Sequence, residues 1–250
     1  MDFSNRTALI TGSGQGVGEG IARALASNGA NVCLVGRTLS KVEAVADDIN
    51  KAGGSAIAIQ CDVKNNDSIN SSIEATVSKF NSLNILINNA QEVPLGNILD
   101  VTDESFINGW DSGPLATFRF MKSCYPHLKG GGKIINLASS SALRPDSNSY
   151  GAYAAVKESI RSLSRAAAVE WGPDNILVNC IMPLAKSAGM DWWMNEHPDE
   201  ANEFLKTIPL GRVGDCKDDI GQAVCHILSD GMNYITGSTI MLDGGQAYLR

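Results

Sequence analysis

The sequence predicts an α/β fold, a doubly wound sheet of seven parallel strands in a single domain. Short apolar segments alternate with helical patterns along the chain, and several of them are apolar without interruption. A glycine-rich turn joins the first segment to the first helical pattern. Strands that alternate with helices form right-handed crossovers and a parallel sheet, and continuous apolar runs are typical of strands buried on both faces.

The strand-like segments recur along the whole chain. They cover residues 7–10, 31–35, 56–61, 83–88, 132–137, 176–182 and 238–242. No linker rich in Pro, Gly or Ser divides them. We therefore expect residues 1–250 to form one domain, a length that allows a sizeable core.

Helical patterns fill the intervals between these segments. The first pattern ends at Gly29, a residue type that is common just after a helix. In the second, Ser40 is the expected N-cap of an apolar stripe. The later patterns cover 67–80, 103–128, 153–172 and 218–228. Gly113 and Pro114 interrupt one of them, and we expect a kink there because proline removes an N–H and clashes with the carbonyl four residues back.

Residues 183–209 form a polar, acidic stretch that nevertheless contains the adjacent Trp192 and Trp193. Two indoles in such a sequence are more typical of a lid or a pocket wall than of a core. We therefore expect a substrate loop or lid at about residues 184–208.

The composition argues against several classes of function. The chain has 20 Lys and Arg against 27 Asp and Glu, a net charge of −7 without any basic run, which disfavours nucleic-acid binding. No segment is apolar enough to cross a membrane or to act as a signal peptide. The six cysteines contain no Cys-x-x-Cys pair, and the three histidines are far apart. We expect free thiols in the cytoplasm, and no metal site.

The turn at residues 11–18 reads TGSGQGVG and lies between the first strand and the first helix. Gly12 would allow the sharp turn, Gly16 the close approach of a pyrophosphate, and Gly18 the packing of helix on strand. The free N–H groups and the dipole of the helix start would attract the anion. We expect this turn to bind a dinucleotide through Gly12, Ser13, Gln15, Gly16, Val17 and Gly18.

The second strand runs into Gly36 and Arg37. Sites for NAD usually carry a carboxylate here, which accepts a hydrogen bond from the ribose 2′-OH. A guanidinium would instead pair with a 2′-phosphate. We therefore expect NADP(H), with NAD(H) as the alternative because Gln15 is neutral where a second basic residue could have stood.

With these motifs in order, the chain resembles a short-chain dehydrogenase/reductase along essentially its whole length. The resemblance is carried by Thr11-Gly12-x-x-x-Gly16-x-Gly18, Asn88-Asn89-Ala90, Tyr153-x-x-x-Lys157 and Asp243-Gly244-Gly245. It implies a Rossmann fold, hydride transfer between a nicotinamide and a ketone/alcohol pair, and a homotetramer or homodimer. It also implies cofactor contacts from Asp62, Val63, Asn89, Ala90, Tyr153, Lys157, Pro183 and Leu184.

The chemistry of ketone reduction explains the Tyr-Lys pair. Tyr153 can protonate the developing alkoxide, but a phenol near pKa ~10 is a poor acid/base at neutral pH. Lys157 lies one helical turn along, and its charge is expected to lower that pKa. A serine hydroxyl can hold the substrate oxygen. The residues flanking it favour Ser139 for this role, with Ser140 as the competing candidate.

Three departures from the family pattern involve four positions. Gly113 stands where the family commonly has an Asn that helps to hold a water, and we hypothesise that a carbonyl freed by the kink, or Ser112, holds it instead. Gln91 replaces a Gly and is expected near the nicotinamide ribose or the substrate, or facing a loop. Leu184 replaces a second Gly, and its backbone is expected to reach the carboxamide. Ala188 replaces a Thr, and the neighbouring Ser187 is a substitute hydroxyl.

The expected substrate walls, residues 91–97, 141–150 and 184–205, are largely apolar and aromatic, with Arg144 as the exception. We expect substrate contacts from Gln91, Ser140, Trp192 and Trp193, and a hydrophobic ketone or secondary alcohol as substrate. A 3-oxoacyl thioester is an alternative substrate, for which Arg119, Lys122 and Lys129 would form a weak basic patch. Isomerase or lyase chemistry is a further alternative.

The helices at 103–128 and 153–172 are apolar on more than one face, which predicts an oligomer.

Overall fold

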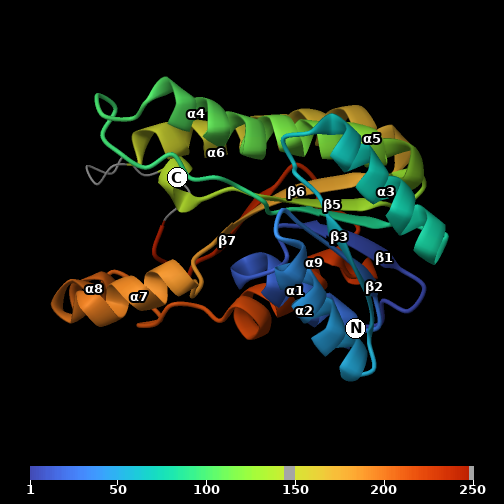
Figure 1. Ribbon diagram of the computed structural model, residues 1–250, viewed down its shortest axis with the longest axis horizontal. Coiled ribbons are helices and arrows are strands. Elements are labelled where there is room, and N and C mark those ends of the chain that lie inside the picture. Colours follow the sequence, from blue (N-terminus) through green and yellow to red (C-terminus); the bar gives the residue numbers. More distant parts are fainter. Residues whose placement is uncertain (144–149, 248–250) are drawn as a thin grey trace.

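The computed structural model describes residues 1–143 and 150–247, with the side chains of residues 188 and 189 excepted. Arg144 and most of the expected substrate segment 141–150 lie outside the described residues. The remaining chain folds around one sheet with helices on both faces (Figure 1).

The sheet has seven parallel strands in the order β3-β2-β1-β4-β5-β6-β7, which confirms the predicted fold class. The strands are β1 (Thr7–Thr11), β2 (Asn31–Gly36), β3 (Ser55–Gln60), β4 (Ile85–Asn88), β5 (Lys133–Leu137), β6 (Leu177–Pro183) and β7 (Thr239–Leu242). The order reverses between β1 and β4, and ligands of such sheets bind beyond the carboxyl ends of the strands at this point.

Two apolar cores explain the uninterrupted apolar strands. The helices are α1 (Gly16–Ser27), α2 (Leu39–Lys51), α3 (Asn66–Phe80), α4 (Asp103–Trp110), α5 (Ala116–Leu128), α6 (Gly151–Trp171), α7 (Ala188–Glu196), α8 (Pro198–Lys206) and α9 (Gln222–Leu228). Ile10 of β1 packs with α1, α2 and α9 on one face, and Leu9 packs with α3, α5 and α6 on the other. Both faces of the strand are buried, so both residues must be apolar.

The expectation for the N-cap was wrong: Ser40 lies inside α2, which begins at Leu39 after Thr38, and Thr38 makes no side-chain cap bond. The interruption expected at Gly113 and Pro114 takes the form of a π turn, residues 111–115, that joins α4 to α5. The Ala116 N–H donates to the Asp111 carbonyl, five residues back, so one extra residue accommodates the proline in a continuous helical path.

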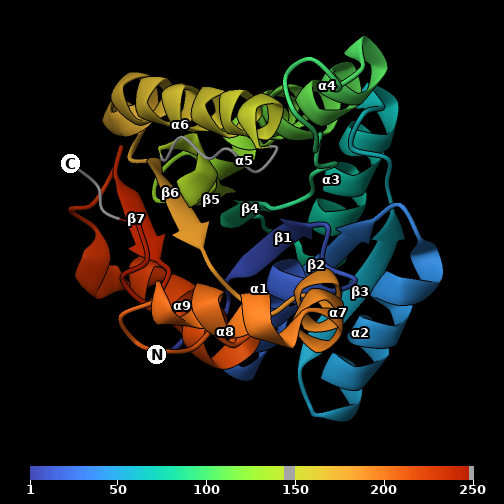
Figure 2. The same cartoon turned by 90° about the vertical axis from the view of Figure 1, so that its left-hand side faces the viewer.

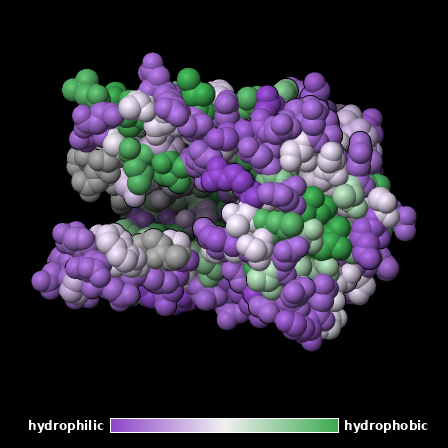
Figure 3. Space-filling view, viewed as in Figure 1, coloured by the Kyte–Doolittle hydropathy of each residue, from purple (hydrophilic) through white to green (hydrophobic). Residues whose placement is uncertain are grey.

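The stretch 183–209, expected to be a lid, folds into the paired helices α7 and α8. Trp193 packs edge-on against Phe204, with ring centroids 5.7 Å apart, whereas Trp192 is 61% exposed. Figures 1 and 2 place the pair on one side of the strand ends, with α4 and its preceding loop on the other. The space-filling view shows a cleft between these two parts (Figure 3).

All six cysteines are free and five are buried, in agreement with their scattered spacing. In the part of the chain that the structure describes, no helix is long and apolar enough to cross a membrane. The same residues contain no group of three or more His, Cys, Asp or Glu side chains that could hold a metal ion.

Candidate active site

The glycine turn adopts a backbone that side chains would strain. Gly12 and Gly16 have φ of +65° and +60°, in the left-handed region that favours glycine. A Cβ at Gly12 would lie 2.8 Å from Asn89 Nδ2, whereas a Cβ at Gly16 would meet no atom within 4 Å. Gly12 therefore serves the tight turn, and Gly16 presents bare backbone to open space.

The turn is fixed to the end of β4 by hydrogen bonds. Asn89 Nδ2 donates to the carbonyls of Thr11 and Gly12, at 2.9 and 3.0 Å. The N–H groups of Asn89 and Ala90 donate to Thr11 Oγ1. A Cβ at Gly18 would lie 2.6 Å from the Gly12 carbonyl oxygen, so the helix can approach the turn only because this residue is Gly.

A cavity of about 360 Å³ opens in front of this turn. Residues expected to bind the cofactor contribute to its wall, namely Gly12, Gln15, Gly16, Arg37, Asp62, Val63, Asn89 and Ala90. Two others face the protein interior: Ser13 Oγ accepts the Val35 N–H at 3.0 Å, and Val17 packs against the core. Their side chains support the turn and do not reach a phosphate.

Lys41 also lines the cavity, and the sequence analysis missed it. Its Nζ donates to Gln15 Oε1 at 2.8 Å, which brings a second cation to the position where Gln15 had weakened the expectation of NADP(H). Its place in α2, the helix that follows Arg37, does not by itself show that the side chain reaches Gln15. The bare backbone at Gly16 and the two cations at the cavity fit the phosphates of a dinucleotide.

Ser139, Tyr153 and Lys157 meet where β5 ends beside α6. Ser139 lies near enough to Tyr153 for its hydroxyl to lower the pKa of the phenol, and its Oγ accepts the Ser141 N–H at 3.2 Å. Lys157 Nζ lies 5.6 Å from the Tyr153 ring centroid and donates to the Leu137 carbonyl at 2.7 Å. Ser140 begins a short helical turn, and it is Ser139 that acts on the Tyr153 pKa.

The expected lowering of the Tyr153 pKa does not occur in this structure. Burial of the phenol raises its pKa to about 12, against a lowering by the Ser139 hydrogen bond. Burial also lowers the pKa of Lys157 to about 8. Desolvation outweighs attraction here because the ammonium is directed at the Leu137 carbonyl.

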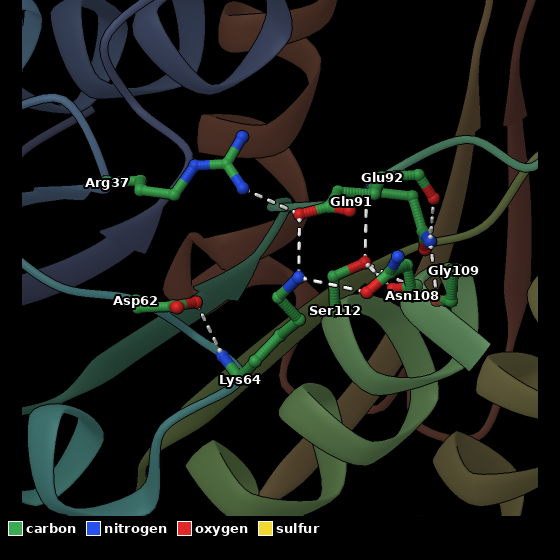
Figure 4. A network of polar contacts seen from close by, with 8 residues as sticks. All are labelled: Arg37, Asp62, Lys64, Gln91, Glu92, Asn108, Gly109 and Ser112. Atoms are coloured by element: carbon green, nitrogen blue, oxygen red, sulfur yellow. Dashed lines mark hydrogen bonds and ion pairs between the residues drawn. The ribbon is translucent and has the colours of Figure 1, made fainter. Parts of the chain in front are cut away.

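Gln91 occupies the space that Gly113 leaves open. A Cβ at Gly113 would lie 2.3 Å from Gln91 Oε1, and Gln91 Nε2 donates to the carbonyls of Glu92 and Gly109 at 2.6 and 2.8 Å (Figure 4). Gln91 and Gly113, two of the three departures from the family pattern, are thus in contact. Each position compensates for the other in volume.

Two groups at the helix interruption that could hold the expected water already have partners within the chain. The Ser112 hydroxyl donates to the Asn108 carbonyl at 2.6 Å and accepts the Glu92 N–H at 2.9 Å. The Gly109 carbonyl, which the helix interruption leaves available, accepts from Gln91. Both groups support the loop after β4 instead.

Both backbone polar groups of Leu184 already have partners within the chain. Its N–H donates to the Leu242 carbonyl at 2.9 Å and its carbonyl accepts from the Gly214 N–H at 3.1 Å. The first bond lies at the end of the ladder between β6 and β7, where Pro183 pairs with Leu242, and the second lies beside the isolated bridge between Ala185 and Gly214. Ser187 Oγ accepts the Met190 N–H at 3.2 Å and caps α7.

Known proteins share this architecture. A family model described as enoyl-(acyl carrier protein) reductase matches residues 12–247. The chain is 37% identical over 252 residues to a 12alpha-hydroxysteroid dehydrogenase of Clostridium sp., covering 97% of each chain. It is 32% identical over 246 residues to a 3-oxoacyl-(acyl-carrier-protein) reductase of Chlamydia trachomatis, covering 97% of this chain and 98% of that one.

Solved structures agree with the sequence comparisons. A short-chain type dehydrogenase/reductase from Mycobacterium ulcerans superposes with a TM-score of 0.92 at 27% identity, over 98% of this chain and 91% of that one. A 3-ketoacyl-(acyl-carrier-protein) reductase from Brucella melitensis, complexed with NADH, gives a TM-score of 0.88 at 29% identity, over 98% and 99%. The chain belongs to the short-chain dehydrogenase/reductase family and is an NAD(P)-dependent oxidoreductase.

Proposed function

We propose that this enzyme interconverts an apolar ketone and its secondary alcohol with NADP(H) as the preferred cofactor. The observation that carries the proposal is the grouping of Ser139, Tyr153 and Lys157 where β5 ends beside α6. When bound, the nicotinamide supplies or accepts the hydride. The chain supplies the proton and the groups that orient the substrate.

The proton belongs to Tyr153 in this proposal. A pKa of about 12 keeps the phenol protonated at neutral pH, in the form that can donate to a developing alkoxide. Ser139 holds the substrate oxygen in the line of that donation. Lys157, cationic below its pKa of about 8, stabilises the negative charge that forms on Tyr153 and contacts the nicotinamide ribose.

The cleft supports an apolar substrate. The loop between β4 and α4 exposes Val93, Leu95, Ile98 and Leu99, and α7 exposes Trp192. Large exposed apolar side chains on the elements that flank the cleft favour a hydrophobic ligand. The hydroxysteroid dehydrogenase among the relatives makes a fused-ring ketone or alcohol the first class to test, with α7 and α8 as a lid that covers it.

The preference for NADP(H) rests on Arg37 and Lys41 at one end of the cavity. Two cations can neutralise a 2′-phosphate. Isothermal titration should show NADPH binding more tightly than NADH. The Arg37→Ala variant should lose about ten- to a hundredfold in NADPH affinity, since a charge-assisted contact contributes roughly 1.5–3 kcal/mol.

A 3-oxoacyl thioester is the second candidate, because the family model and one relative carry that kind of name. The structure gives it less support than the apolar substrate. Arg119 Nη1 donates to the Lys64 carbonyl at 2.8 Å, and Lys129 pairs with Asp174 at 3.4 Å. Two members of the expected basic patch are thus engaged within the chain.

The active enzyme is proposed to be a homotetramer or homodimer in the cytoplasm. Phe106 and Trp110 of α4 and Phe118 of α5 are exposed aromatic residues. A second copy of the chain would cover them. The free thiols fit a reducing compartment.

The decisive assay offers ketosteroids and 3-oxoacyl thioesters with NADPH and follows nicotinamide absorbance. Oxidation of NADPH with a ketosteroid supports the proposal, and oxidation only with a thioester selects the second candidate. Substrate conversion without any change in absorbance would contradict both and indicate isomerase or lyase chemistry.

A further inference from the structure

We propose that Glu92 limits the preference for NADP(H) by competing with the 2′-phosphate for Arg37. The inference rests on the proposed binding of that phosphate at Arg37. Arg37 Nη1 lies 2.7 Å from Glu92 Oε1, and Lys64 Nζ lies 3.2 Å from the same oxygen (Figure 4). One carboxylate oxygen thus serves two cations at the wall of the cavity.

The main chain at Glu92 is held at both of its polar groups. Its N–H donates to Ser112 Oγ at 2.9 Å, and its carbonyl accepts from Gln91 Nε2 at 2.6 Å. Ser112 belongs to the π turn between α4 and α5, and Gln91 is itself fixed by its bond to the Gly109 carbonyl of α4 (Figure 4). The carboxylate is therefore positioned by fixed backbone rather than by a free loop.

Lys64 anchors the carboxylate at the same oxygen that Arg37 contacts. Its Nζ also donates to Asn108 Oδ1 at 3.1 Å, and its carbonyl accepts from Arg119. The Lys64 side chain is 27% exposed, whereas that of Arg37 is 67% exposed. Arg37 is thus the member of the cluster that has the freedom to move toward a ligand, and Glu92 the member that stays.

The competition follows from charge. A 2′-phosphate that pairs with Arg37 must draw the guanidinium from Glu92, or accept the repulsion of a carboxylate beside it. NADH has a hydroxyl at that position and meets neither cost. Glu92 therefore weakens NADPH binding selectively. It acts from the end of β4, across the cavity from the end of β2, where a specificity carboxylate is usually sought.

The test is a cycle of variants measured by isothermal titration with NADPH and with NADH. Glu92→Gln keeps the shape and removes the charge. We expect NADPH affinity to rise about three- to tenfold and NADH affinity to stay within about twofold, in line with a partly exposed ion pair. In the Arg37→Ala background, the same substitution should change NADPH affinity less than twofold. Glu170→Gln, at an exposed site on α6, is the matched charge control and should change neither affinity.

Three results would overturn the inference. NADPH affinity could be unchanged or lower in Glu92→Gln. The gain in affinity could be equal for NADPH and NADH, which would show that Glu92 acts only through the overall charge of the protein. NADH affinity could fall alone, which would make Glu92 a ribose ligand. The ratio of NADPH to NADH affinity in wild type tests the cofactor preference separately. Tighter NADH binding in wild type would contradict the proposed NADP(H) preference. A selective gain in NADPH affinity that depends on Arg37 would still support the role of Glu92.

Discussion

Around the ends of β1 and β4, glycine backbone and main-chain hydrogen bonds set the geometry, as at Gly12 and Gly16. Around the end of β5 and the start of α6, three side chains set it, and burial decides their protonation. The first region tolerates no Cβ at Gly12, and the second depends on the charge states of Tyr153 and Lys157. Substitutions should therefore affect cofactor affinity in the first region and the chemical step in the second.

The largest effect is expected for Tyr153→Phe. Loss of the general acid should lower the rate of ketone reduction about 10²–10⁴-fold. NADPH affinity by titration should stay within a few-fold, because the phosphate end of the cavity is untouched. Tyr150→Phe is the matched control, since its ring lies 6.1 Å from that of Tyr153. Equal rates for Tyr153→Phe and wild type would remove Tyr153 from the chemistry.

The next prediction distinguishes backbone strain from steric contact of an added Cβ, by comparing Gly12 in the glycine turn with Gly53. Gly12 combines a positive φ with a close contact, since its Cβ would lie 2.8 Å from Asn89 Nδ2. Gly12→Ala should therefore lower the free energy of unfolding by about 2–4 kcal/mol. Gly53 also has a positive φ, but a Cβ there would meet no atom within 4 Å. The backbone strain alone should make Gly53→Ala less costly, at roughly half the loss expected for Gly12→Ala.

Denaturant unfolding measures the cost of both substitutions. Titration should show lost NADPH affinity for Gly12→Ala alone, because Gly53 lies outside the wall of the cavity. Equal costs would contradict the role of the close approach at Gly12.

These regions also differ in how far the sequence could predict them. The fold class and the turn at Gly12 and Gly16 follow from local patterns, since apolar runs and glycines determine nearby backbone. The pKa of Tyr153 depends on desolvation by distant elements, which no local pattern shows. Lys41 and Glu92 reach the cavity through contacts made only after folding, and the spacing of neither residue predicts them.

A third prediction concerns the pH dependence that Lys157 brings. Its pKa is about 8 in the folded state against 10.5 for an ordinary lysine, so between these values the unfolded chain binds more protons. The contribution of Lys157 to stability should therefore rise with pH across this window, and it should be lost as pH falls through 8. The slope is at most about 1.4 kcal/mol per pH unit.

Comparison with Lys157→Met isolates this contribution from that of the thiols. The pKa of Cys216 is raised from 9.0 to about 11, so its contribution falls with pH and opposes that of Lys157. All six cysteines have raised pKa values, so the thiols lower stability as pH rises in both proteins. In urea unfolding from pH 8 to pH 10, the slope of stability against pH should therefore be more positive for wild type than for the variant, whatever the sign of either slope. Parallel trends would mean that Lys157 is not desolvated in solution.

The smallest effect concerns the contact of Gln91, after β4, with Gly113 in the π turn between α4 and α5. A Cβ at Gly113 would displace the Gln91 carboxamide, which donates to two carbonyls. Gly113→Asn alone should therefore destabilise the enzyme by about 1 kcal/mol, the net contribution of a typical hydrogen bond. The double variant Gln91→Gly with Gly113→Asn restores the volume on the helix side. It should be more stable than the sum of the single changes predicts, by about 0.5–2 kcal/mol in denaturant unfolding. Additive single effects would show that the two positions are independent. Gln91 would then not compensate for the Asn that the family commonly has at the position of Gly113.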